Sequence, residues 1–137
     1  MDTYYASTGN APARVLQIIR AAMVAAVLLF GGVTWHIHSS TGWVKAETPE
    51  ALGYVILAAW AGIAAVMWVM TRMYRAAPDR PRRVTVTIIG WALGEAAAMM
   101  GAIHYFLTDD PTRYFGGLII FACALALFPI PPDEPAR

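Results

Sequence analysis

The sequence predicts an all-α membrane protein, a single domain of four transmembrane helices in two hairpins with both termini in the cytoplasm. Hydrophobic residues make up 58% of the 137 residues and charged residues 14%, whereas about 25% of an ordinary soluble domain is charged. The apolar residues are gathered into four long runs, and none of these runs shows the polar stripe that a helix of a soluble bundle carries. The runs cover residues 15–35, 51–71, 84–107 and 115–130.

Each apolar run predicts one helix. We expect the helices at about residues 14–36, 50–72, 84–107 and 113–130. The first three runs reach the roughly 20 residues that are needed to cross about 30 Å of hydrocarbon. The fourth run has 16 residues. It would therefore need neighbouring helices, local thinning of the bilayer or its Tyr114 end to complete a span.

Capping residues support two of the expected helix starts. Thr48, Pro49 and Glu50 have the order of an N-cap, a proline in the first turn and an acid near the helix N-terminus. Asp110 and Pro111 repeat the first two of these features before the fourth helix. Prolines then end the last helix, because proline cannot continue a helical hydrogen-bond ladder. These are Pro129, Pro131 and Pro132.

The basic residues predict the orientation. The segment 72–83 holds five arginines and one acid, whereas the other two connections hold one basic residue each, Lys45 and Arg113. Basic loops stay in the cytoplasm, so we place this segment and both termini on the cytoplasmic side of a bacterial inner membrane. The arginines of the segment are Arg72, Arg75, Arg80, Arg82 and Arg83.

Two further features exclude a cleaved signal peptide and cysteine-based sites. The first apolar run is too long for the core of a signal peptide, so we expect it to be retained. Cys123 is the only cysteine, which excludes an internal disulfide and every multi-cysteine metal motif.

Glu95 is the most informative residue, because it is the only formally charged residue within 84–107. It lies about 17 Å along that run, near the centre of a bilayer. An ionisable group at this depth is costly and is therefore protonated, paired or functional. Three interpretations stay open. Glu95 binds a proton or cation, it is a neutral acid hydrogen-bonded to a neighbouring helix, or it pairs with Arg20 of the first run.

Small residues follow one face of the same helix. They are Gly90, Gly94, Ala97 and Gly101. Such small-xxx-small spacing lets two helix backbones approach closely. We therefore expect the third helix to be central to the bundle or to form the interface of a homo-oligomer.

The third helix also resembles a known family. Residues 88–101 read IIGWALGEAAAMMG, and residues 72–107 are similar to the carboxylate helix of rotary ATP synthase c subunits. This resemblance implies that Glu95 matches the ion-binding carboxylate. Trp60 and Trp68 of the second helix would not fit the tight ring of that family. The whole chain more closely resembles uncharacterised small four-helix bacterial membrane proteins, a group that implies a fold and no activity.

The three histidines, His36, His38 and His104, fall near the predicted outer side, with Asp109 and Asp110 close by in sequence. One of these histidines could bind a pigment or haem as an axial ligand. His36 and His38 point about 200° apart on a helix, so their spacing predicts no preformed metal site. The alternative is that these histidines hydrogen-bond to water and lipid headgroups.

Three functional classes follow. The first is a non-catalytic accessory or scaffolding subunit of a larger membrane complex, respiratory or photosynthetic, which binds lipids and other integral membrane subunits. The second is a small transport protein that binds a proton or cation at Glu95. The third is a pigment- or metal-binding subunit that uses the histidines. No sequence motif of an enzyme is present, and the net charge of +1 gives no indication of nucleic-acid binding.

Overall fold

The computed structural model of the chain describes residues 12–41, 47 and 50–133, and these residues contain four α-helices and no strand. The helices are α1 (Ala13–Thr41), α2 (Glu50–Ala76), α3 (Arg80–Thr108) and α4 (Thr112–Leu127). The all-helical prediction is therefore confirmed. By length and composition, α1, α2 and α3 are each able to cross a membrane, whereas α4 is a shorter apolar helix.

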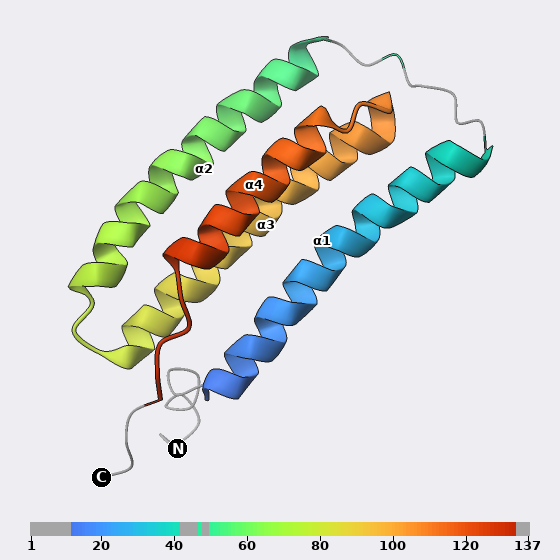
Figure 1. Cartoon of the computed structure of the whole chain (residues 1–137). Coiled ribbons are helices and arrows are strands. Elements are labelled where there is room, and N and C mark those ends of the chain that lie inside the picture. Colours follow the sequence, from blue (N-terminus) through green and yellow to red (C-terminus); the bar gives the residue numbers. More distant parts are fainter. Residues whose placement is uncertain (1–11, 42–46, 48–49, 134–137) are drawn as a thin grey trace, which may run out of the picture.

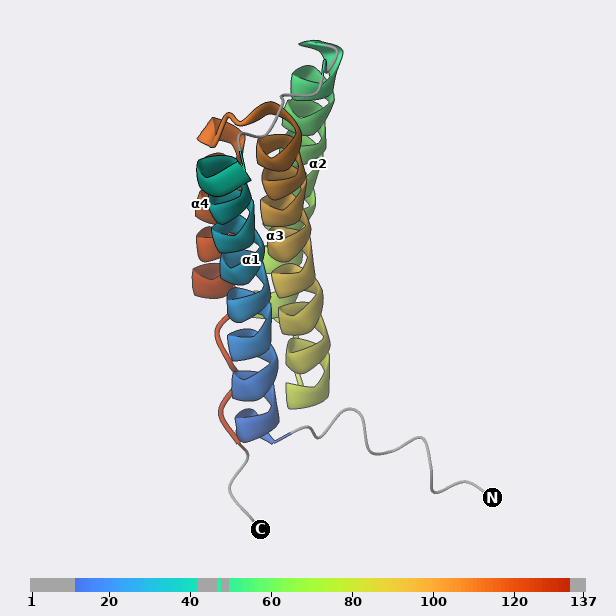
Figure 2. The ribbon, with the colours of Figure 1, turned by 90° about the vertical axis from the view of Figure 1, so that its right-hand side faces the viewer.

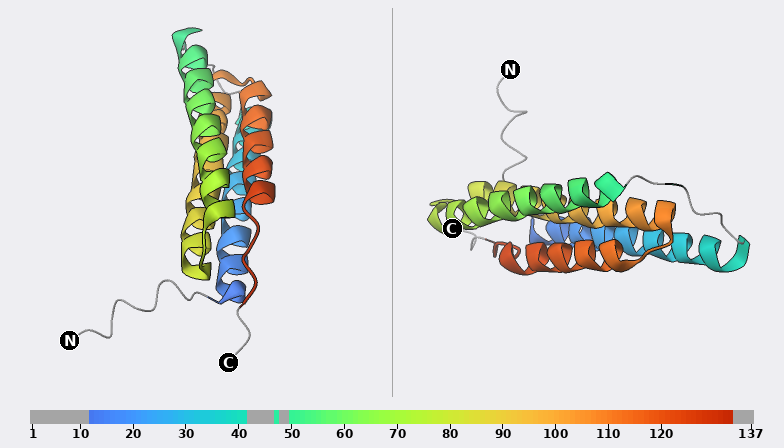
Figure 3. Two further views of the ribbon diagram at one scale, coloured as in Figure 1. Left: turned by 90° about the vertical axis from the view of Figure 1, so that its left-hand side faces the viewer. Right: turned by 90° about the horizontal axis from the view of Figure 1, so that it is seen from above.

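The helices alternate in direction, and α3 is the centre of the arrangement. Figure 1 shows α3 and α4 side by side between α1 and α2, and α3 contacts each of the other three helices. Figure 2, with α1 nearest the viewer, and Figure 3 show the four helices from other sides. In an apolar stretch of 18 residues taken from each of the three long helices, half of the residues are buried in α3, against 17% in α1 and 22% in α2.

The prediction of two hairpins holds for only one pair of helices. A turn of three residues, 109–111, joins α3 to α4, and these two helices pack along each other. Over their described residues, α1 and α2 make no such extended contact, and α1 packs against α3 instead. The physical reason is the length of the connections, because a three-residue turn forces its two helices together and the longer segment 42–49 does not. The expected cap at Thr48 and Pro49 lies outside the described residues.

The arginine-rich segment is mostly helical and was wrongly expected to be a loop. Only residues 77–79 separate α2 from α3. Asp79 is the N-cap of α3, and its carboxylate accepts a hydrogen bond from the backbone N–H of Arg82 at 2.9 Å. Pro81 lies in the first helical turn, where a missing N–H has no cost. Arg80, Arg82 and Arg83 therefore belong to α3, and Arg72 and Arg75 to α2.

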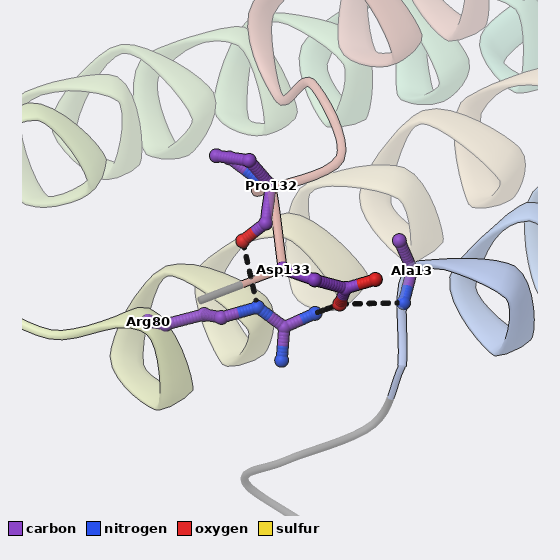
Figure 4. A network of polar contacts seen from close by, with 4 residues as sticks. All are labelled: Ala13, Arg80, Pro132 and Asp133. Carbon is purple, nitrogen blue, oxygen red and sulfur yellow. Dashed lines mark hydrogen bonds and ion pairs between the residues drawn. The ribbon is translucent and has the colours of Figure 1, made fainter. Parts of the chain in front are cut away.

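The starts of α1 and α3 meet the C-terminal segment at one end of the bundle. The guanidinium of Arg80 contacts the Asp133 carboxylate at 2.7 Å, and its Nε–H donates to the carbonyl of Pro132 at 2.9 Å. The same Asp133 oxygen accepts from the backbone N–H of Ala13 at 3.1 Å (Figure 4). Asp133 thus supplies from 120 residues away the cap that Pro12 cannot give to α1.

Loss of this contact is expected to loosen one end of the bundle. The Arg80→Ala variant should unfold with a free energy lower by about 1 kcal/mol, because Asp133 is partly solvated and the pair is correspondingly weak. The matched control is Arg82→Ala, which removes a neighbouring exposed arginine and should change little. Hydrogen exchange of the Ala13 amide measures the effect directly. Equal exchange in both variants would contradict the assigned role of Arg80.

Two apolar clusters form the core. The cluster nearer the Arg80–Asp133 contact surrounds Trp91 and Phe128, both fully buried. Its residues come from all four helices and from the segment after α4. The other surrounds Val27, Ala98 and Phe121. Because α1 and α2 contact their neighbours on one side only, large apolar residues stay exposed along both of them. Among these are Ile18, Leu28, Leu29, Val55, Val66 and Val69.

Candidate functional site

The small-residue face of α3 is buried against α4. A Cβ atom added to Gly94 would lie 2.6 Å from the Cβ of Ala124, and one added to Gly90 would meet the Phe128 ring. At Gly101 the added atom would meet the backbone carbonyl of Arg113. Ala97 is fully buried, and its carbonyl accepts a hydrogen bond from Trp60 Nε1 of α2 at 3.1 Å. This face therefore packs within the chain, and a homo-oligomer could use it only if α4 moved away.

Glu95 lies at the edge of α3 that faces α1. It belongs to the same helical row as Trp91, Ala98 and Ala102. Trp91 contacts Arg20 of α1, and the two alanines share a cluster with Val27 of α1. Glu95 itself is half-buried. Within the described residues its carboxyl has no hydrogen-bond or ion-pair partner.

The predicted pair between Arg20 and Glu95 is not formed. The Arg20 guanidinium lies over the Trp91 ring, 5.9 Å from the ring centroid. Trp91 precedes Glu95 by one helical turn, about 6 Å along the axis. The aromatic face therefore holds the cation at its own level, below the carboxyl. Of the three interpretations of Glu95, binding of a proton or cation and a neutral hydrogen-bonded acid stay open.

The structure does not bring the three histidines together. His38 Nδ1–H donates to the Thr34 carbonyl at 2.7 Å, and its ring stacks on Tyr105 with centroids 5.3 Å apart. Nε2 of His38 is buried. His36 is exposed on α1, and His104 lies 3.3 Å from the hydroxyl of Thr108. No group of three or more metal-binding side chains occurs in the described part of the chain.

The two acids of the α3–α4 turn have structural roles. Asp109 has a φ of 60°, and its N–H closes α3 by donating to the Tyr105 carbonyl at 2.9 Å. Asp110 accepts from the hydroxyl of Thr112 at 2.6 Å and from its backbone N–H at 3.0 Å. These two hydrogen bonds hold the pKa of Asp110 below its usual value. The expectation that Asp110 is the N-cap of α4 is wrong, because Pro111 occupies that position and has no side-chain cap. Asp110 lies one residue earlier and closes the turn that precedes the helix.

Sequence reasoning did not find a groove between α2 and α4. It has a volume of about 510 Å³, and its lining is mostly apolar, with two arginines of α2 among the lining residues. The Arg72 guanidinium lies over the Trp68 ring, 5.2 Å from its centroid. The signal in the sequence was the spacing of Trp68, Arg72 and Arg75 at four and three residues, which places them on one helix face. The lining residues are Ala64, Met67, Trp68, Thr71, Arg72, Arg75, Ile119, Ile120, Cys123 and Leu127.

Comparison with known proteins finds no match for this chain. No protein-family model matches the chain, and no curated protein or solved structure matches it. The similarity of residues 72–107 to rotary ATP synthase c subunits stays a prediction from the sequence. What is established for this chain is an all-helical fold with three helices that are long and apolar enough to cross a membrane.

Proposed function

We propose that this chain is a non-catalytic subunit of a larger membrane assembly, which it stabilises by packing its helices against those of partner subunits. The observation that carries the proposal is the half-buried Glu95 carboxyl, which has no partner in the described residues. A carboxyl near the middle of a membrane-spanning helix is costly unless another group pairs with it. A hydrogen-bond donor on a partner helix would supply that group at the edge between α1 and α3.

The outer surfaces of α1 and α2 support the same proposal. Trp35 is 66% exposed and Tyr54 72%, and aromatic residues of this size are frequent at protein interfaces. Gly32 of α1 and Gly62 of α2 have open space where a Cβ would lie. Small residues on an outer face allow another transmembrane helix to approach closely. Whether the host complex is respiratory or photosynthetic stays a prediction.

A second candidate function rests on the same carboxyl. A carboxyl without a partner in its own chain is also what a proton- or cation-binding transport protein would use. In that case the partner of Glu95 is the transported ion, and no other subunit is needed. The two functions therefore differ in what Glu95→Gln changes, since glutamine keeps the size and hydrogen-bonding capacity of the side chain but cannot take up or release a proton.

Mild detergent extraction from native membranes tests the proposal. We expect the wild-type chain to migrate as part of a large assembly with identifiable partner subunits. The Glu95→Leu variant should retain roughly a tenth to a third as much partner, because one intramembrane hydrogen bond contributes about 1 kcal/mol. Glu95→Gln should retain most of it. The helical circular dichroism of each variant controls for misfolding.

Two results would contradict the accessory role. One is a wild-type chain that is extracted without partners under conditions that keep other complexes intact. The other is partner binding that is equal in the wild type and Glu95→Leu. A chain without partners whose ion flux in vesicles disappears in Glu95→Gln would establish the transport function instead.

A further inference from the structure

The groove between α2 and α4 combines an apolar floor with two cations at one end. Arg72 and Arg75 are exposed residues in the last two turns of α2, and the remaining lining is almost entirely apolar. We propose that this groove binds one anionic phospholipid, whose phosphate contacts Arg72 and Arg75 and whose acyl chain lies along the groove. The inference requires that the chain spans a membrane, and it is independent of the proposed assembly role.

Charge complementarity is the first argument. In the described part of the chain no carboxylate pairs with Arg72 or Arg75, and the salt bridge at this end joins Arg80 to Asp133. The Arg72 guanidinium lies over the Trp68 ring, a contact that leaves its N–H groups available at the edge. Guanidinium groups bind phosphate oxygens with paired hydrogen bonds. Basic pockets between transmembrane helices on the cytoplasmic side are typical sites for anionic headgroups.

The end of α4 explains why the cations are accessible. Tyr74, between the two arginines in sequence, donates its hydroxyl hydrogen to the Pro129 carbonyl at 3.3 Å. Pro129 lies beyond Leu127, the last residue of α4. The two arginines are therefore at the level where α4 has ended and no longer covers α2. Above that level α4 forms the second wall, with Ile119, Ile120 and Cys123.

The dimensions agree with one leaflet. From Arg72, the inner of the two arginines, the α2 lining extends to Ala64, eight residues or about 12 Å along the helix axis. Half of a hydrocarbon core is about 15 Å thick. A phosphate held at Arg72 and Arg75 would therefore place an acyl chain along the apolar part of the groove, with its end near the middle of the bilayer. The groove volume of about 510 Å³ is within the range of roughly 300–1,000 Å³ of ligand pockets.

Cys123 provides a reporter inside the groove, because it is exposed, free and the only cysteine of the chain. The experiment measures its alkylation by a maleimide in the purified full chain in mild detergent. Phosphatidylglycerol, phosphatidylcholine with the same acyl chains, or inorganic phosphate is added. Native mass spectrometry of the same samples counts the bound lipid. We expect phosphatidylglycerol to slow the alkylation about tenfold and to remain bound as one molecule, with phosphatidylcholine and phosphate having little effect.

Two double variants remove the same charge from different places. Arg72→Gln/Arg75→Gln should weaken phosphatidylglycerol binding roughly tenfold. Arg14→Gln/Arg82→Gln, two exposed arginines at the same end that do not line the groove, should leave the binding unchanged. Cys123→Trp, followed by mass spectrometry alone, should abolish retention by filling the acyl half of the groove.

Three results would overturn the assignment. Equal protection by the zwitterionic lipid would show a groove that accepts any acyl chain. Protection by inorganic phosphate alone would show an anion site without a lipid. Equal losses in the two double variants would show a general effect of net charge.

Discussion

Truncation of Trp91 to alanine is expected to lower the free energy of unfolding by about 3–5 kcal/mol. Trp91 is fully buried at the centre of the cluster that joins α3 to the segment after α4. Its Nε1–H donates to the Phe128 carbonyl at 2.9 Å, one of the carbonyls that the end of α4 leaves without a helical partner. Its ring also lies beneath the Arg20 guanidinium.

Two further variants separate these contributions. Trp91→Phe keeps most of the apolar volume but loses the hydrogen bond, so it should lose about 1–2 kcal/mol, chiefly by leaving the buried Phe128 carbonyl unsatisfied. Trp35→Ala removes a tryptophan that is 66% exposed and should change the free energy of unfolding by no more than about 0.5 kcal/mol. Reversible unfolding of the detergent-solubilised protein measures all three. Similar losses at Trp91 and Trp35 would contradict the placement of Trp91 in the core.

The sequence predicted the elements better than their arrangement. Apolar runs and prolines place the helices to within a few residues in most cases, because the periodicity and length of a membrane-spanning helix are local properties of the chain. The start of α3 at Arg80 was missed, since the expected helix began with the apolar run at residue 84, although a proline such as Pro81 is compatible with a first helical turn. The Asp79 cap was the overlooked signal.

Tertiary contacts explain what the sequence could not predict. The partner of Asp133 is Arg80, and its second contact is the N–H of Ala13. No local pattern links residues that are 53 and 120 positions apart. For the same reason the sequence could not show whether Arg20 contacts the Glu95 carboxyl or the Trp91 ring, since both lie on α3, far from Arg20 in sequence. A single sequence also cannot say which of several tryptophans points inward, because each of them suits both a core and a membrane interface.

For Glu95, the sequence predicts the depth in the helix, whereas only the tertiary structure gives the neighbours. Its depth in an apolar helix follows from counting residues. Its surroundings depend on which helix lies beside that edge of α3. In the structure this helix is α1, and its Arg20 lies over the Trp91 ring and not beside the Glu95 carboxyl. The carboxyl is therefore left without a partner in the described residues because of packing, which the composition of α3 does not reveal.

A glycine-to-alanine substitution is expected to have opposite effects at Gly117 and Gly62. At Gly117 in α4 the new Cβ would lie 2.6 Å from the Ala97 carbonyl oxygen and 2.7 Å from the Ala98 Cα. Both are backbone atoms of α3, which cannot rotate away, so the two helices must separate. We expect a loss of about 1–3 kcal/mol. At Gly62 in α2 there is nothing within 4 Å of the new atom, so the change should be neutral or stabilising by up to about 1 kcal/mol, through the higher helix propensity of alanine.

The pair is informative because the chemical change is identical at the two positions. Any general effect of alanine on the unfolded chain or on detergent binding is shared by the two variants, so the difference between them measures the close approach of α3 and α4 alone. Thermal unfolding followed by circular dichroism gives that difference. If Gly117→Ala were as stable as Gly62→Ala, the two central helices would lie further apart than the contacts of Gly94, Gly101 and Gly117 require, and the small-residue face of α3 would be available to another helix.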